Sequence, residues 1–200
     1  MRVSRVQAAE NRETVINVAS RLFRERGFDG IGLKDLMKGA GLTQGAFYKQ
    51  FASKDDLAAQ ASRRAVESAS RRWTEAAAAN PEDPLAAVTA FYLSTQHRRQ
   101  RRDGCPIVAL GADAARQGKD VKASFEAGIR AHLELLGRMM AESEGEVSKG
   151  KAMAVLSTMV GAMTLARVVN DPDLAQAFLD AAAAQVRATR ADRDPAQGKK

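Results

Sequence analysis

Residues 36–51, LMKGAGLTQGAFYKQF, decide the fold of the N-terminal part of this 200-residue chain. Apolar residues between 33 and 40 recur at the spacing of one helix face, and Gly41 ends that pattern. A second short helix is predicted over residues 44–51, with its two phenylalanines buried one turn apart and the Thr43 hydroxyl as its N-cap. Two short helices joined by a turn that contains glycine are typical of a helix-turn-helix motif.

A longer amphipathic helix is predicted before this motif, over residues 10–26. Its apolar residues follow a helical stripe, and Gly27 stands where a helix commonly ends; the stripe consists of Val15, Ala19, Leu22 and Phe23. Residues 1–54 are therefore predicted to form a three-helix domain, and we expect it to bind DNA because its charge is unbalanced. It holds ten Lys and Arg against five Asp and Glu, within a chain whose net charge is +7.

The face of the third helix that lies outside the predicted core carries small and polar side chains. Gln44 can read adenine, and Ala46 can contact a thymine methyl group. Thr43, Tyr48 and Lys49 suit phosphate oxygens. Such residues at the start of a recognition helix favour insertion into the major groove over a merely solvated surface.

Three blocks of residues resemble the N-terminal domain of the tetracycline-repressor (TetR/AcrR) family: FRERGFDGI at 23–31, the stretch 36–51, and SKDDL at 53–57. A weaker resemblance follows at 161–174. The resemblance implies a homodimeric transcriptional regulator, usually a repressor, that a small ligand releases from operator DNA. It also implies DNA contacts by Thr43, Gln44, Ala46, Tyr48 and Lys49, and a phosphate contact by Lys54. Gly32 departs from the Ser or Thr of many relatives, which removes one side-chain hydrogen bond.

The remaining sequence predicts an all-α fold, because helix-favouring residues dominate and strand-like runs are missing. Helices are expected over residues 54–79, 84–103, 106–117, 120–144, 148–169 and 172–188. This pattern predicts a DNA-binding domain (1–54), a helical ligand-binding and dimerisation domain (55–188), and a disordered polar tail (189–200). We expect the homodimer to form through the helices at about 148–169 and 172–188, because the first of them is apolar on two sides.

The composition excludes several classes of protein. The uncharged stretch 152–166 has 15 residues, fewer than the roughly 20 that a membrane-spanning helix needs, and the N-terminus has no secretory signal. We therefore expect a soluble cytoplasmic protein without a membrane partner. One cysteine excludes a disulfide framework, and together with His97 and His132 it has no metal-site spacing. No cofactor motif is present, so neither a metal nor a cofactor is predicted.

Cys105 is the one candidate for a reactive side chain. It is predicted to be the N-cap of a helix that Pro106 opens, near Arg101 and Arg102, and both influences favour the thiolate. Its segment also resembles a position in family branches that sense electrophiles, although a single cysteine is often a buried apolar residue. The effector pocket, if it is not plain core, is expected to be lined by Phe91, Tyr92, Thr95, Cys105, Phe125, Ile129, Met159 and Met163.

The leading hypothesis is a dimeric, sequence-specific DNA-binding regulator, a repressor that an unidentified small molecule or modification of Cys105 releases from a palindromic operator. Two alternatives remain. One is an architectural protein that binds DNA without sequence preference. The other is an enzyme with Cys105 as nucleophile, which we do not expect because no catalytic constellation accompanies the cysteine.

Overall fold

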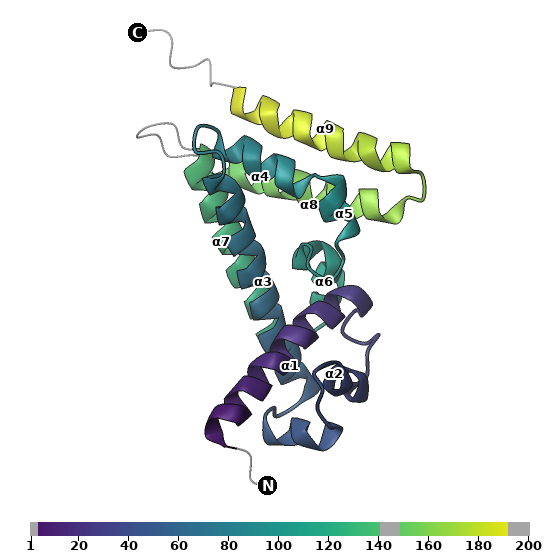
Figure 1. Cartoon of the computed structure of the whole chain (residues 1–200). Helices are drawn as coiled ribbons and strands as arrows, with labels where there is room; N and C mark the ends of the chain where they lie inside the picture. The colour runs from purple at the N-terminus through teal and green to yellow at the C-terminus, as the bar shows by residue number, and fades with distance from the viewer. Residues whose placement is uncertain (1–3, 141–148, 192–200) are drawn as a thin grey trace. The chain divides into compact units, whose positions relative to one another are not determined.

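The computed structural model describes residues 4–140 and 149–191 of the chain. Every regular element in those ranges is a helix, which confirms the all-α fold class (Figure 1). The chain divides into two compact units: unit 1 comprises Met1–Arg71 and Gln100–Ile129, and unit 2 comprises Arg72–Arg99 and Arg130–Lys200. The functional boundaries expected at residues 54 and 188 stay a prediction.

Unit 1 begins with α1 (Arg5–Arg26), which starts earlier than the apolar stripe predicts. The hydroxyl of Ser4 accepts a hydrogen bond from the backbone N–H of Gln7 at 3.1 Å and caps the helix. The cap makes a polar first turn helical, which an apolar stripe cannot indicate. At the other end Gly27 has a φ of 77°, the left-handed conformation that glycine tolerates best, as predicted.

The helix-turn-helix of unit 1 consists of α2 (Leu33–Gly39) and η1 (Gln44–Lys49), followed by α3 (Lys54–Ala78). The predicted third helix is thus a short 3-10 helix rather than an α-helix. The expected cap by Thr43 is wrong: Thr43 occupies the N-cap position, but its side chain makes no capping hydrogen bond.

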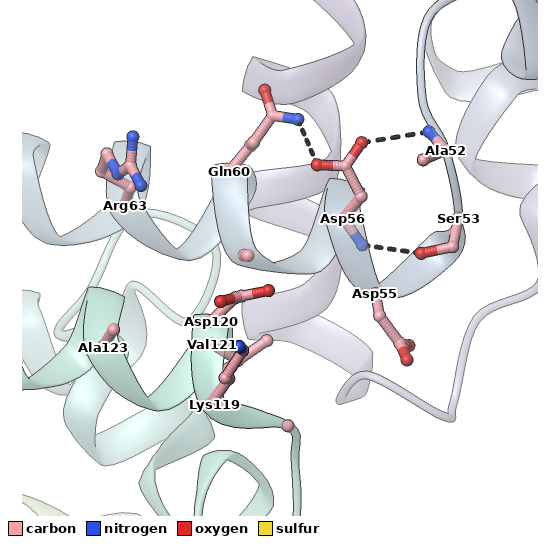
Figure 2. A pocket seen from close by; sticks show the side chains of 12 residues that line it. Ala52, Ser53, Asp55, Asp56, Gln60, Arg63, Lys119, Asp120, Val121 and Ala123 are labelled. Atoms are coloured by element: carbon pink, nitrogen blue, oxygen red, sulfur yellow. Dashed lines mark hydrogen bonds between the residues drawn. The ribbon is translucent and has the colours of Figure 1, made fainter.

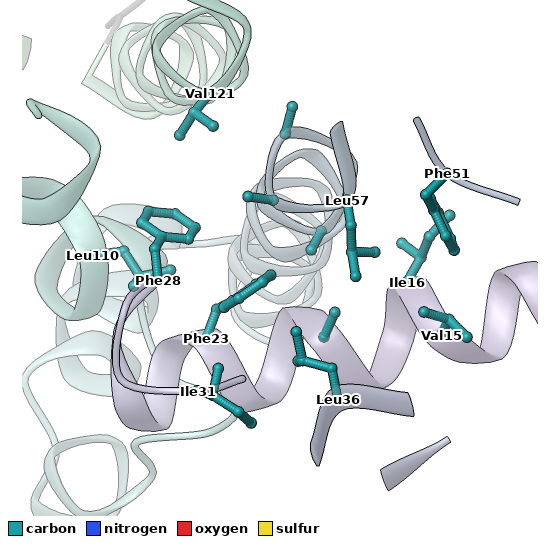
Figure 3. Close-up of a cluster of buried hydrophobic side chains, with 14 of the residues drawn as sticks. Val15, Ile16, Phe23, Phe28, Ile31, Leu36, Phe51, Leu57, Leu110 and Val121 are labelled. Carbon is teal, nitrogen blue, oxygen red and sulfur yellow. The ribbon is translucent and has the colours of Figure 1, made fainter. Parts of the chain in front are cut away.

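Two later helices, α6 (Pro106–Ala114) and α7 (Lys119–Met140), contribute to the core of unit 1. Figure 3 shows this buried cluster, in which side chains from the first helices pack with Leu110 and Val121. Gly128 of α7 lies so close to α3 that an added Cβ would come within 1.8 Å of a methyl carbon of Val66. The two helices therefore need a residue without a side chain at this position.

Unit 2 contains α4 (Pro84–Tyr92) and α5 (Thr95–Arg99) where the sequence predicts one helix over residues 84–103. The interruption lies at Ser94, whose hydroxyl donates to the carbonyl of Phe91 at 2.8 Å and accepts from the N–H of His97 at 3.0 Å. Serine competes with helical hydrogen bonds in this way, so the side chain starts a new helix here.

The helices α8 (Lys149–Val168) and α9 (Pro172–Ala191) pack against each other in unit 2 (Figure 1). By length and composition alone α8 could cross a membrane, since it reaches a mean hydropathy of 1.2. Its inner face is buried within the unit, as in a core helix; that face consists of Ala152, Val155, Leu156, Met159, Ala162, Met163 and Ala166. The helix α9 extends beyond its predicted end at Ala188, and residues 192–200 of the predicted tail lie outside the described residues.

Two histidines are buried in unit 2 among aromatic rings. The Nδ1–H of His97 donates to the carbonyl oxygen of Tyr92 at 2.6 Å, and the His97 ring stacks on Phe91. Burial lowers the pKa of His97 to about 4, so this ring is neutral at pH 7. His132 lies edge-on to Trp73, with ring centroids 4.4 Å apart, and belongs to the core.

Candidate nucleic-acid interface

The turn between α2 and η1 is held by backbone hydrogen bonds. The N–H of Gly41 donates to Lys38 at 3.0 Å, and the N–H of Leu42 donates to Met37 at 2.9 Å. Gly41 has a φ of 70°, which places it in the left-handed region where a side chain would be strained. This turn directs η1 away from α2 and fixes which of its side chains are buried.

The predicted DNA-contacting residues lie mainly on the outside of η1. Thr43, Gln44, Tyr48 and Lys49 are exposed, whereas Phe47 is buried in the core. The exposed fraction of Tyr48 is 69%, which is unusual for an aromatic side chain and leaves its hydroxyl available to a partner. The remaining two predicted residues are half-buried; they are Ala46, which packs against the core, and Lys54, the first residue of α3.

Two reciprocal hydrogen bonds between Asp56 and the residues before the helix fix the start of α3, and with it the position of Lys54. The N–H of Asp56 donates to the Ser53 hydroxyl at 3.0 Å, while the Asp56 carboxylate accepts from the N–H of Ala52 at 3.1 Å (Figure 2). Such reciprocal bonds satisfy amide groups that would have no partner at a helix start.

The same carboxylate begins a chain of side chains that ties α1 to the start of α3 and to Phe51, which follows η1. Asp56 accepts from Gln60 at 2.7 Å, and Gln60 accepts from the guanidinium of Arg12 at 2.5 Å. Arg12 also lies over the ring of Phe51, 5.2 Å from its centre. Sequence reasoning counted Arg12 only as a basic residue, because partners 48 positions away leave no local signal.

The predicted effector-pocket residues are distributed over both units. Unit 1 holds Cys105, Phe125 and Ile129, and unit 2 holds Phe91, Tyr92, Thr95, Met159 and Met163. Three hollows at the surface of the described residues are lined by other side chains. One of them, of about 650 Å³, lies beside the starts of α3 and α7 (Figure 2). The predicted pocket therefore stays a prediction.

Cys105 occupies the N-cap position of α6, directly before Pro106, as the sequence predicts. Its side chain makes no capping hydrogen bond and is 5% exposed. Of the two arginines expected to act on the thiol, Arg102 forms an ion pair with Glu25 at 2.9 Å, which lowers the pKa of Glu25. An electrophile could reach the buried Cys105 sulfur only after a local opening of the chain around it.

Residues 15–61, which contain α2 and η1, match the family described as "Bacterial regulatory proteins, tetR family". The HTH-type transcriptional repressor NemR of Escherichia coli (strain K12) is 26% identical over 134 residues, which cover 66% of this chain and 67% of NemR. The HTH-type transcriptional regulator AcrR of Shigella flexneri is 32% identical over 105 residues, or 50% of this chain and 49% of AcrR.

Solved structures agree with the fold over a larger part of the chain. The crystal structure of the reduced form of E. coli NemR has a TM-score of 0.75 at 24% identity and covers 90% of this chain and 97% of that one. A TetR transcriptional regulator from Chloroflexus aurantiacus has a TM-score of 0.77 at 24% identity, with coverage of 93% and 96%. At these identities the likeness shows the fold: an N-terminal helix-turn-helix followed by a helical domain.

Proposed function

The chain belongs to the TetR/AcrR family of DNA-binding transcriptional regulators, and we propose that it is a homodimeric repressor of a palindromic operator. Each protomer would place η1 in the major groove, with the two half-sites about 34 Å apart. A small molecule, or modification of Cys105, would release the dimer from DNA. The protein would act in the cytoplasm, where its operator is accessible.

The row of exposed polar side chains on η1 carries this proposal. Gln44 and Ala46 would contact base edges, while Thr43, Tyr48, Lys49 and Lys54 would contact the phosphate backbone. The buried Phe47 on the opposite side anchors these residues to the core. Phosphate contacts position a protein on the duplex, and base contacts supply its sequence preference, so the two sets have separable effects.

Gln44→Ala is expected to weaken binding to the cognate operator by about 1–3 kcal/mol and to relax the preference at one base pair in each half-site. Lys54→Gln should instead weaken binding to all sequences and lower the slope of log K against log salt by about 1 per contact. Fluorescence anisotropy with operator variants at several salt concentrations measures both effects.

A matched control is Lys122→Gln, which removes one exposed lysine from α7. If Gln44→Ala weakened binding equally to all sequences, its base-reading role would be refuted. Operator footprinting tests the geometry, because protection without two-fold symmetry would contradict the dimer. Binding without any sequence preference would favour the architectural alternative.

The outer faces of α8 and α9 support dimerisation through these helices. Four large apolar side chains of the two helices are between 45% and 74% exposed; they are Met153, Leu165, Val168 and Leu174. Apolar side chains on neighbouring helices of one protomer indicate a surface that another protein covers. A second copy of the chain would supply the same two helices and complete a four-helix interface.

Gly161 of α8 provides the test of this interface, because a Cβ added there would meet no atom within 4 Å in the protomer. Gly161→Arg should leave the protomer folded and shift the assembly from dimer to monomer, as measured by sedimentation equilibrium. The control is Gly118→Arg, since Gly118, directly before α7, is equally open and lies on neither of the two helices. A Gly161→Arg protein that stays dimeric would place the interface elsewhere.

A thiol switch at Cys105 would operate through local opening, because the side chain is buried in the described structure. A mild electrophile is then expected to release the wild-type protein from its operator slowly, whereas Cys105→Ser should stay bound. The measurement is an operator titration with each protein before and after treatment. If Cys105→Ser were released from the operator as readily as the wild type, Cys105 would only pack in the core. Reversible ligand binding would then be the trigger.

A further inference from the structure

Unit 1 contains a polar hollow of about 510 Å³ between one face of α1 and one face of α3. On α1 it is lined by residues at positions i, i+3, i+4 and i+7, namely Asn17, Ser20, Arg21 and Arg24. This spacing places the four side chains on one helix face, directed toward a neighbouring helix. Asn17 and Arg21 are exposed, whereas Ser20 and Arg24 are buried, so the face stays polar from the solvent to its buried edge.

The facing side of α3 repeats the same arrangement. Its lining residues are again spaced i, i+3, i+4 and i+7: Arg64, Glu67, Ser68 and Arg71. The loop residue Asp103 completes the wall. We call this feature the arginine hollow, because four guanidinium groups line it against two carboxylates. The four cations repel one another. Two carboxylates in the lining and a third outside it, Glu13, leave an excess of one positive charge.

The carboxylates that offset these arginines are held at the surface. Asp103 accepts from Arg21 at 3.0 Å and lies 3.9 Å from Arg24, and its side chain is 49% exposed. Arg64 pairs at 2.5 Å with Glu13, whose side chain is 52% exposed, and also donates to the side-chain oxygen of Asn17 on the facing helix. Ion pairs of this exposure contribute little to stability, so an anion of higher charge can replace their carboxylates.

Arg24 is the fixed point of the hollow. Its side chain is 3% exposed, and its guanidinium donates to the carbonyl oxygens of Ser20 at 2.9 Å and Gly104 at 3.0 Å. A guanidinium held in this way keeps its positive charge at a fixed place in the wall of the hollow. Arg71, by contrast, is exposed and forms no ion pair or hydrogen bond with other described residues.

We propose that the arginine hollow binds a small molecule with two or more phosphate or carboxylate groups, which displaces Asp103 from Arg21. The volume lies within the range of small-molecule sites, about 300–1,000 Å³. One oxyanion group would contact Arg21 near the fixed charge of Arg24, and a second would contact Arg64 and Arg71 on α3. The site uses none of the residues assigned to DNA and stands independently of the proposed repressor function.

The test is isothermal titration of the full-length protein with sodium pyrophosphate and, separately, with sodium citrate. We expect one saturable site per chain for at least one of these probes. Arg71→Gln should weaken its binding about fivefold to tenfold, because one charge-assisted contact is lost at an exposed position. The control is Arg63→Gln. It also removes one positive charge from α3, but Arg63 does not line the hollow, so the affinity for the probe should be unchanged.

A second variant is expected to increase the affinity for the probe rather than to decrease it. Asp103→Asn removes the competing carboxylate and keeps the shape of the side chain, so it should tighten probe binding severalfold. If the four arginines bound no ligand, neither probe would show saturable binding to the wild-type protein or to any variant. Absence of binding for both probes up to millimolar concentration would therefore overturn the proposal, as would equal weakening by Arg71→Gln and Arg63→Gln.

Two outcomes would show that the probe binds at the DNA-contacting face, or that the arginines of the hollow bind DNA. If Lys49→Gln weakened pyrophosphate binding as much as Arg71→Gln, the probe would be bound at the DNA-contacting face. If Arg71→Gln lowered operator affinity without any probe more than Arg63→Gln does, the hollow would contact DNA phosphates. Either result would overturn the proposal without affecting the repressor function, which Gln44→Ala tests separately.

Discussion

Replacing Phe47 with alanine is expected to lower the free energy of unfolding by about 3–5 kcal/mol, the usual cost of removing a buried phenylalanine ring. Phe47 is 1% exposed and stacks on Phe51, with ring centroids 5.3 Å apart. It is the only fully buried side chain that the six residues of η1 supply to the core. Its loss would therefore release the recognition segment as well as leave a cavity. Urea denaturation followed by circular dichroism measures the change.

Tyr48 provides the matched control for this prediction. It is the next residue of η1 and another aromatic ring, in edge contact with Phe47 at 5.3 Å, but it is exposed. Tyr48→Ala should change stability by no more than about 0.5 kcal/mol, as for most surface substitutions, and should weaken operator binding. A loss below about 1 kcal/mol for Phe47→Ala would contradict the role of Phe47 as the anchor of η1.

Gly128→Ala is expected to destabilise the protein by about 2–3 kcal/mol, although alanine is normally the better helix former. The new Cβ would lie 1.8 Å from one methyl carbon of Val66 and 2.9 Å from its Cβ, so α3 and α7 would have to separate. Thermal unfolding measures the loss. In Gly137→Ala the same change on the same helix meets no atom within 4 Å, and it should stabilise by about 0.5–1 kcal/mol.

The contact with Val66 can be tested by a second substitution. Val66→Ala removes the two methyl groups that the new Cβ would strike, so the double variant Gly128→Ala/Val66→Ala should be more stable than the sum of the single effects predicts. Strict additivity of the two changes would show that the close approach of the helices does not cause the loss.

Much of the fold could be predicted from the sequence, because each helix carries an apolar stripe with glycine or proline at its ends. Gly27 and Gly41 were predicted as helix ends, and both have a positive φ. The errors fall where a single polar side chain decides the outcome. Ser4 extends α1, Ser94 divides the predicted helix over 84–103, and Thr43 makes no capping bond. A hydroxyl that can cap a helix does not reveal whether it does so.

The candidate site was predictable in part for a similar reason. The exposed face of η1 follows from its helical spacing, so Gln44 and Tyr48 could be chosen from the sequence alone. The side chains that tie α1 to the start of α3 could not, because Arg12 and Gln60 are far apart in the chain. Arg24 entered the sequence analysis only as one of ten basic residues, and its bond to the carbonyl of Gly104, 80 residues later, and its burial left no local signal.

The core of unit 1 is completed by residues from 110 to 125, after the chain has passed through residues 72–99 of unit 2 (Figure 3). A ribosome adds about 5–20 residues per second, so the N-terminal helices wait several seconds for Leu110 and Phe125 to be synthesised. During that interval the apolar surfaces of Phe23 and Phe28 are uncovered, and the nascent chain is open to chaperones and proteases. An N-terminal fragment that ends before residue 100 would lack Leu110 and Phe125, so its apolar surfaces would stay uncovered.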